Sequence, residues 1–203
     1  MRPKFTNCEV YTFADEAQKK AMAEALASVE SEAGKEYDLV INGERVKGDG
    51  LLKTINPSDK DMVLGVFQKG TPELAEKAIR AADTAFEQWQ HVPAGERAEY
   101  LFKAAEIMKR RRIELGATMV LEEGKNWIEA DADVCEAIDF LEFYAREMIR
   151  YAEPQGLTPF PGEQNEYFYI PLGVGVVIPP WNFPLAILVG MTSAAIVAGN
   201  AVV

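Results

Sequence analysis

The chain has 203 residues, of which 48% are hydrophobic, and carries a formal net charge of −11 at pH 7. This apolar content is sufficient for a folded globular core. The acidic balance and the single histidine argue against a nucleic-acid partner, because affinity for the phosphate backbone depends on clustered Lys and Arg.

The residue content also argues against a metal site and a membrane span. The cysteines, Cys8 and Cys135, are too few and too far apart in the sequence for a disulfide framework or a zinc site. The first eight residues lack the apolar core of a signal peptide. Four prolines interrupt the apolar region from Ile170 onward, which predicts a sheet segment and not a spanning helix. We therefore expect a cytoplasmic protein without a metal or a membrane partner.

The first elements are predicted by helix formers and turn residues. Residues 14–31 predict a helix that packs against the rest of the chain. Residues 38–46 predict a hairpin, because Asn42-Gly43 favours the positive φ angles of a type I′ turn. Residues 51–55 and 62–67 predict two short strands around a turn at 56–59.

Two amphipathic patterns follow. Thr71 is a candidate N-cap, and the apolar side chains after it recur at helical spacing. They predict one buried stripe made of Ala75, Ile79, Ala82, Phe86 and Trp89. After Pro93 a second helical pattern continues through Leu121, and we interpret its basic run at 109–112 as a solvated face.

A long helix is predicted over 127–150, after an αL cap at Gly124. One face is apolar and consists of Val134, Ile138, Leu141, Ala145 and Met148. The other face mixes carboxylates with aromatic rings and consists of Glu129, Asp133, Glu136, Phe140 and Phe143. On pattern alone we interpret the second face as partly solvated, and Cys135 as a buried thiol.

The last third of the chain predicts a projecting arm and the start of a parallel sheet. Residues 164–170 predict an aromatic strand after a proline-rich turn, which on pattern alone is a surface hairpin. Residues 173–178 predict a strand buried on both faces, followed by a turn, a helix at 185–197 and a strand at 201–203. This order predicts an α/β fold with its ligand site at the turn. Asn182 in that turn is, taken alone, a good N-cap.

The turn carries a specific resemblance. The string P-W-N-F-P after G-V-V-I, followed by a helix and G-N-A-V-V, resembles the aldehyde dehydrogenase superfamily. The resemblance implies a Rossmann-like fold without a G-x-G-x-x-G loop, and it implies that the Asn182 amide stabilises the oxyanion formed when a cysteine thiolate adds to an aldehyde. It also implies NAD as cofactor. The residues that the resemblance assigns to the cofactor are Ile178, Pro179, Pro180, Trp181 and Asn182.

A second stretch narrows the resemblance. The segment E-G-K-N-W and the later A-D-A-D-V-C-E-A-I-D-F-L-E-F-Y-A-R are similar to the bacterial branch of the family that oxidises L-glutamate γ-semialdehyde to L-glutamate in proline degradation. This resemblance implies that Glu136 binds the α-ammonium group of the substrate and that Phe183 forms a wall around its aliphatic part. It also implies that residues 155–170 form a β-arm that joins subunits into a homo-oligomer.

The resemblance implies three parts of the chain. Residues 1–154 are the amino-terminal part of a cofactor-binding domain with a helical layer, 155–170 are the arm, and 171–203 begin the Rossmann-like sheet. The nucleophilic cysteine and the general-base glutamate of the family are expected after residue 203, so we expect the chain to begin a longer enzyme. Two alternatives remain: an aldehyde dehydrogenase of another substrate class, in which Glu136 is merely solvated, and a non-catalytic module that acts only in assembly.

Overall fold

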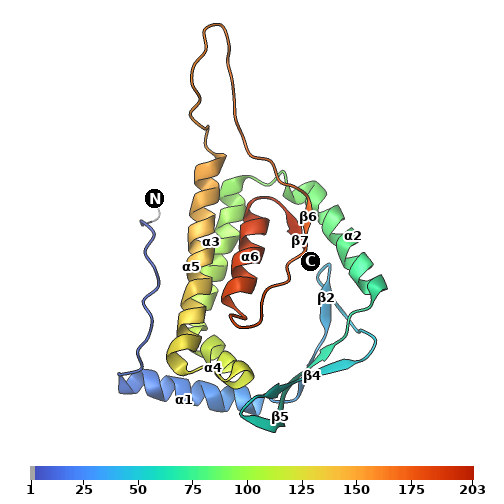
Figure 1. Cartoon of the computed structure of the whole chain (residues 1–203), viewed down its shortest axis with the longest axis vertical. Helices are drawn as coiled ribbons and strands as arrows, with labels where there is room; N and C mark the ends of the chain where they lie inside the picture. Colours follow the sequence, from blue (N-terminus) through green and yellow to red (C-terminus); the bar gives the residue numbers. More distant parts are fainter. Residues whose placement is uncertain (1–2) are drawn as a thin grey trace.

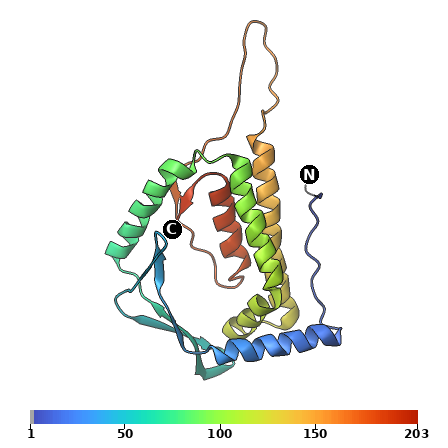
Figure 2. The same cartoon turned by 180° about the vertical axis from the view of Figure 1, so that it is seen from behind.

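The computed structural model describes residues 3–203, so the first two residues of the expected amino-terminal part lie outside the described chain. The fold is α/β, as predicted. Helices α3 and α5 run side by side, α6 lies against them, and α1 and α4 close one end of this helical layer (Figure 1). Seen from behind, α2 and strands β2, β4 and β5 lie on the opposite side of the molecule from α5 (Figure 2).

In the described range, a run of strands follows the first helix, a run of helices follows these strands, and a strand, a helix and a strand end the chain. In chain order they are α1 (Glu16–Ser31), β1 (Lys35–Tyr37), β2 (Leu39–Ile41), β3 (Glu44–Val46), β4 (Leu51–Asn56), β5 (Asp59–Gln68), α2 (Pro72–Trp89), α3 (Ala94–Arg110), α4 (Arg112–Glu123), α5 (Trp127–Ala152), β6 (Val174–Gly175), α6 (Ala186–Val197) and β7 (Ala201–Val202).

Local sequence signals explain the first elements. Helix α1 starts after Asp15, whose side chain accepts a hydrogen bond from Ala17 N at 2.8 Å as an N-cap. The hairpin of β2 and β3 is confirmed, with Asn42 and Gly43 at φ angles of 53° and 77°. Both angles are positive, as a type I′ turn requires.

The amino-terminal sheet has one strand more than the sequence predicts. Strands β4 and β5 are confirmed and pair antiparallel across the predicted turn. Strand β1 then pairs parallel with the other edge of β5, so that the order is β1-β5-β4. Two of the three β1 residues are charged and its partner is distant in the chain, so neither composition nor local pattern indicates this strand.

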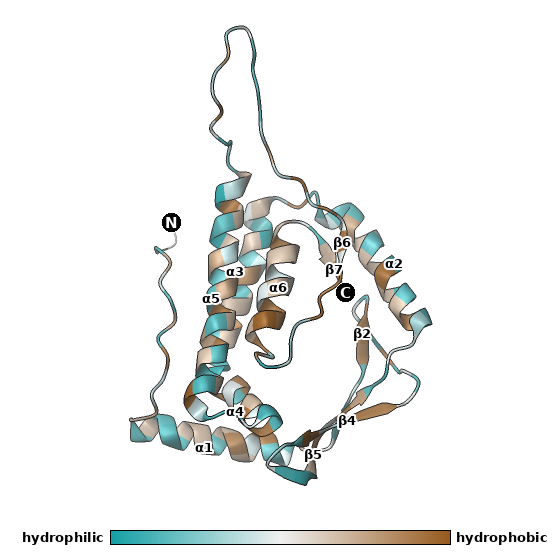
Figure 3. Cartoon of the chain, viewed as in Figure 1, coloured by the Kyte–Doolittle hydropathy of each residue, from teal (hydrophilic) through white to brown (hydrophobic). Residues whose placement is uncertain are grey.

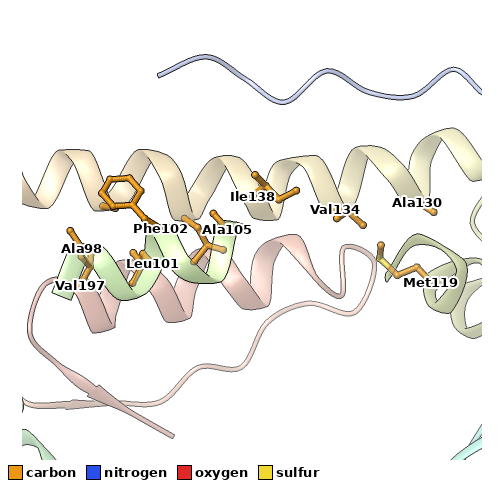
Figure 4. Close-up of a cluster of buried hydrophobic side chains, with 11 residues drawn as sticks. Ala98, Leu101, Phe102, Ala105, Met119, Ala130, Val134, Ile138 and Val197 are labelled. Atoms are coloured by element: carbon orange, nitrogen blue, oxygen red, sulfur yellow. The ribbon is translucent and has the colours of Figure 1, made fainter. Parts of the chain in front are cut away.

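The hydrophobic core lies where α3, α4, α5 and α6 meet. Its buried side chains, most of which Figure 4 labels, are Ala98, Leu101, Phe102, Ala105, Met119, Ala130, Val134, Ile138, Leu141, Ala145 and Val197. They include most of the apolar face predicted for α5, which confirms that prediction. Helix α6, which is hydrophobic at its amino-terminal end (Figure 3), approaches α5 so closely that a Cβ on Gly190 would lie 2.8 Å from the Phe140 ring.

The single helix predicted from Pro93 through Leu121 is wrong. The chain leaves the helical region at Arg111, with φ −98° and ψ 12°, and this residue separates α3 from α4. The next residue, Arg112, is also not on a solvated face as expected. It is 8% exposed and forms a 2.5 Å ion pair with Asp131 of α5, so a long-range ion pair accompanies the break in the helix.

The stripe predicted on α2 is only partly buried, with Phe86 and Trp89 half-buried. The N-cap is confirmed, because Thr71 Oγ1 accepts a hydrogen bond from Leu74 N at 3.3 Å. Of the stripe, however, Ala82 is buried while Ala75 and Ile79 are exposed. Helix α2 packs mainly against the short strands β2, β6 and β7, which leave part of it uncovered, and Trp89 at its carboxyl end donates a hydrogen bond to Ile196 O of α6 at 2.9 Å.

The strands predicted in the last third are shorter or missing. Strand β6 consists of Val174–Gly175 and pairs parallel with β7. The expected burial on both faces is wrong, because Ile178 is 81% exposed and the described chain supplies one neighbouring strand. Residues 164–170 project from the body (Figure 1) without forming a strand, since no ladder partner is described for them.

No helix within residues 3–203 combines the length and the apolar character needed to cross a lipid bilayer.

Candidate functional site

The candidate site is the turn that joins β6 to α6. Its exposed residues include Ile178 at 81%, Trp181 at 83% and Phe183 at 41% exposure, and Asn182 is exposed between them. Large apolar side chains are thus held open to solvent at the carboxyl end of a parallel strand. In open α/β sheets this is where ligands bind.

Asn182 is not the N-cap of the helix that follows. Helix α6 begins at Ala186, and the cap residue is Leu185, which has no side chain able to accept a hydrogen bond. The interpretation of Asn182 as a cap is therefore wrong. Within residues 3–203 the Asn182 side-chain amide makes no hydrogen bond, so it is free to donate to a ligand.

A carboxylate from another helix caps α6 instead. Asp133 of α5 accepts a hydrogen bond from Ala186 N at 2.7 Å through one oxygen and from Lys125 Nζ at 2.6 Å through the other. The expectation of a partly solvated Asp133 is wrong, because the residue is 0% exposed. An anion is favourable at the amino terminus of a helix, where backbone N–H groups lack partners. Asp133 therefore fixes the end of the turn to α5.

Lys125 extends this anchor into the turn. Its Nζ lies 4.3 Å from the centroid of the Phe183 ring, which is a favourable cation–π distance. It also lies 3.9 Å from a Glu123 oxygen. Burial raises the pKa of Glu123, and the charge of Lys125 partly opposes that effect. The Lys125–Asp133 pair thus joins the end of α4, the middle of α5 and the turn.

Glu136 lies one helical turn after Asp133 and has a different environment. It is exposed and lines a cavity of about 550 Å³ between α5 and the amino-terminal segment, together with Phe140 and Phe143. Helix α5 carries seven acidic side chains. Six of them bind a protein partner, namely Glu129, Asp131, Asp133, Asp139, Glu142 and Glu147. Among the described residues, Glu136 is the acid of α5 without a hydrogen bond or an ion pair.

The predicted site residues therefore fall into two groups that share α5 as support. Residues 178–183 form the exposed turn, and Glu136 is exposed on the helix that anchors it. Sequence reasoning missed the anchor, because Lys125 and Asp133 contact the turn only after folding. The E-G-K motif was the available signal for Lys125, and no local signal distinguishes Asp133 from the other acids of α5.

Asn200 is a second residue that sequence reasoning did not assign. Its side-chain oxygen accepts hydrogen bonds from Leu172 N at 2.6 Å and Gly173 N at 3.1 Å, and its amide donates to Ala195 O at 3.1 Å. This side chain joins the start of β6 to the end of α6. Its position after the positive-φ Gly199 is a signal for a helix end, but not for this cross-link.

The described residues contain no group of three or more His, Cys, Asp and Glu side chains that would hold a metal ion. The turn itself offers hydrogen bonding by the Asn182 amide and apolar contact by Ile178, Trp181 and Phe183. Glu136 offers its negative charge on α5, in the cavity beside the amino-terminal segment.

Comparison with known proteins identifies the family that the chain matches. Residues 45–203 match the model of the aldehyde dehydrogenase family. The chain is 53% identical over 190 residues to a 1-pyrroline-5-carboxylate dehydrogenase of a Geobacillus species (strain WCH70), covering 94% of this chain and 37% of the relative. It is 50% identical over 199 residues to 1-pyrroline-5-carboxylate dehydrogenase 2 of Bacillus subtilis (strain 168), covering 98% of this chain and 38% of that relative.

Solved structures agree with this assignment. The structure of 1-pyrroline-5-carboxylate dehydrogenase from Thermus with bound NAD has a TM-score of 0.95 and 48% identity, and the match covers 99% of this chain and 39% of that one. The NAD-bound enzyme of Mycobacterium tuberculosis has a TM-score of 0.87 and 27% identity, with 99% and 38% coverage. The chain thus spans between 37% and 39% of the length of these relatives.

Proposed function

Because the chain belongs to the aldehyde dehydrogenase family, we propose that the protein carrying it oxidises L-glutamate γ-semialdehyde to L-glutamate with NAD, in proline degradation. Asn182 is the oxyanion donor of this reaction. The observation that carries the proposal is that Asp133 caps α6 from a neighbouring helix, which leaves the Asn182 amide exposed and unpaired within residues 3–203. An amide without a structural hydrogen bond is available to a substrate oxygen.

The Asn182 amide acts where charge develops. When a cysteine thiolate adds to the aldehyde carbon, the carbonyl oxygen becomes an oxyanion, and Asn182 Nδ2 donates a hydrogen bond to it. A donor of this kind stabilises the transition state by about 3 kcal/mol. Cys8 and Cys135 lie between the amino-terminal segment and α5 and not in the turn. We therefore assign the nucleophile and the general base to a part of the enzyme outside these 203 residues.

The turn also binds the cofactor in this proposal, through Ile178, Pro179, Pro180, Trp181 and Asn182. NAD, when bound, accepts the hydride. The exposed apolar side chains of Ile178 and Trp181 fit the flat nicotinamide ring, and they lie at the carboxyl end of β6. The chain has no G-x-G-x-x-G loop, so this proposal for the cofactor depends on the turn and not on that phosphate-binding motif.

Glu136 and Phe183 select the substrate. The unpaired carboxylate of Glu136 forms a charge-assisted hydrogen bond with the α-ammonium group of glutamate semialdehyde. Support comes from the exposure of Glu136 and from the pairing of the other acids on α5. The Phe183 ring, held by Lys125, contacts the aliphatic part of the substrate.

Residues 155–170 join subunits of a homo-oligomer, between the cofactor-domain segment 1–154 and the sheet segment 171–203. The arm projects from the body (Figure 1) and exposes large apolar side chains. They include Phe160, Tyr167, Phe168, Tyr169 and Ile170, which are 50% to 71% exposed. An extended segment with unpaired backbone groups is suited to pair with another chain.

The first test is Asn182→Ala in the purified enzyme that carries this chain. We expect turnover with glutamate semialdehyde to fall by about 100-fold or more, because the oxyanion loses its donor. NAD binding, measured by fluorescence titration, should persist, and Gln88→Ala, which removes an exposed amide on α2, should leave turnover unchanged. Unchanged turnover in Asn182→Ala would refute the oxyanion role.

The second test separates this substrate from other aldehydes. Glu136→Ala should raise KM for glutamate semialdehyde by about tenfold or more, because the ammonium group loses a charged partner, while KM for propanal stays the same. Equal effects on both substrates would favour an aldehyde dehydrogenase of another substrate class. A folded protein with no NAD reduction from any aldehyde would favour the non-catalytic assembly module.

A further inference from the structure

The fold brings together two cysteines that are far apart in the sequence. Residues 5–11 run along α5 (Figures 1 and 2). Asp139 accepts a hydrogen bond from Cys8 N at 2.8 Å, and Asp131 accepts one from Tyr11 N at 2.6 Å. This pairing places Cys8 beside Cys135. Both cysteines are free in the structure, and their separation along the sequence does not persist in space.

The two thiols share the same neighbours. Arg112 Nη1 donates to Cys8 Sγ at 3.4 Å, and the Cys135 thiol donates to Glu9 O at 3.7 Å. Arg112 Nη2 donates to the same Glu9 O at 2.7 Å. Burial, followed by a hydrogen bond with the Cys8 thiol, raises the pKa of Cys135. The two thiols thus lie beside the same contact, the one between the Glu9 carbonyl group and the Arg112 guanidinium group.

The two cysteines differ in access. Cys135 is 3% exposed, whereas Cys8 is half-buried, and both line the cavity of about 550 Å³ between α5 and the amino-terminal segment. A small oxidant that enters this cavity therefore meets Cys8 first. Cys135 is shielded from the oxidant beside it, so that its thiol is kept for attack on the oxidised Cys8 sulfur.

We propose that Cys8 and Cys135 are a modification site that takes a small hydroperoxide and closes to a disulfide. With hydrogen peroxide, the Cys8 sulfur attacks one peroxide oxygen, the S–O bond forms, the O–O bond breaks, and water leaves with the thiol proton. The Cys135 sulfur then attacks the Cys8 sulfur, the S–S bond forms, the S–O bond breaks, and a second water leaves. Two thiols are oxidised and one peroxide is reduced to two waters.

Disulfide formation needs a specific Cβ–S–S–Cβ geometry, and residues 3–11 have no helix or strand that would resist a small adjustment. The bond would attach the amino-terminal segment to α5 at the residue before Glu136. Because the closed loop includes most of the chain, the oxidised protein should also have a higher Tm than the reduced protein.

Peptide mapping of the purified protein tests the proposal. After treatment with hydrogen peroxide and alkylation without reduction, trypsin should release residues 5–19 linked to residues 126–146. The linked species should weigh two hydrogens less than the sum of the peptides and should disappear after treatment with dithiothreitol. Cys8→Ser and Cys135→Ser should each abolish it, and a circular dichroism spectrum should show that each variant is folded.

Three outcomes would overturn the proposal. One is recovery of both peptides separately alkylated after peroxide treatment. Another is conversion of Cys8 to sulfinic acid while Cys135 remains alkylated, which would show that the thiols do not meet. The last is a linkage found only in a disulfide-bonded dimer on a non-reducing gel, because the bond would then form between copies and not within one chain.

Discussion

Removal of the Asp133 carboxylate should strongly destabilise the protein. Asp133 is 0% exposed and accepts two hydrogen bonds, from Lys125 Nζ at 2.6 Å and from Ala186 N at 2.7 Å. In Asp133→Ala, the Lys125 side chain, which is 12% exposed, keeps only Glu123 at 3.9 Å as a charged partner, beside the Phe183 ring, and Ala186 N loses its acceptor. Breaking a buried pair by removing one partner costs about 3 to 5 kcal/mol. We expect about 3 kcal/mol, because Lys125 turns toward Glu123.

Urea unfolding of the purified protein measures this free energy. The matched control is Glu136→Ala, because Glu136 is an acid on the same helix that is exposed and unpaired within residues 3–203. This variant should change the free energy of unfolding by less than about 0.5 kcal/mol. The double variant Lys125→Met with Asp133→Ala should recover part of the loss, because no buried charge remains without a partner. The reasoning fails if Asp133→Ala is no less stable than Glu136→Ala.

Two further predictions concern α5 and its contact with α6. Burial acts to raise the pKa of Glu142, but hydrogen bonds from Lys109 and Arg146 outweigh it and hold the pKa below its ordinary value of 4.5. The folded state therefore binds fewer protons than the unfolded state, so stability should fall as the pH drops through the depressed pKa, and Glu142→Gln should flatten that dependence in urea titrations at several pH values. Gly190→Ala should destabilise the protein by about 1 kcal/mol despite its gain in helix propensity, because the new Cβ meets the Phe140 ring at 2.8 Å. Gly116→Ala on α4 is the control and should be neutral or stabilising, since its nearest neighbour is the flexible end of Met22 at 3.4 Å, and equal effects of the two substitutions in thermal unfolding would contradict this account.

The elements that the sequence predicted correctly are those with local causes. The Asn42-Gly43 turn, the Thr71 cap and the αL conformation of Gly124 each depend on residues within a few positions. The apolar face of α5 is likewise a property of one segment, because helical periodicity alone defines it. For these features, the information in a short window is sufficient.

The features that the sequence did not predict depend on contacts between distant segments. Strand β1 exists because β5 offers it an edge, and Arg112 is buried because Asp131 accepts its hydrogen bonds. The strand predicted at 164–170 has no described partner, so an aromatic β pattern does not produce a ladder there. In each case the presence or absence of a partner, and not the local pattern, decided the structure.

The same reasoning bears on the candidate site. Sequence alone offered Asn182 two roles, cap or donor, and both require the same amide. The structure removes the first role, because the Asp133 carboxylate satisfies Ala186 N from another helix. A local pattern cannot show that a distant residue caps the helix in place of Asn182. The capping role of Asp133 is therefore the contact that the sequence could not predict.

The acids of α5 likewise divide into those that bind another part of the protein and one that does not. An isolated helix of this sequence would present seven similar carboxylates to water. In the fold, Asp131, Asp133 and Asp139 hold other segments to α5, and Glu129, Glu142 and Glu147 pair with nearby side chains. If one of these six acids bound a ligand instead, the protein would lose the stabilisation from the contact that the acid makes. Glu136 has no such contact in residues 3–203, so a cation can bind it without breaking one, and this supports the proposal that Glu136 binds an ammonium group.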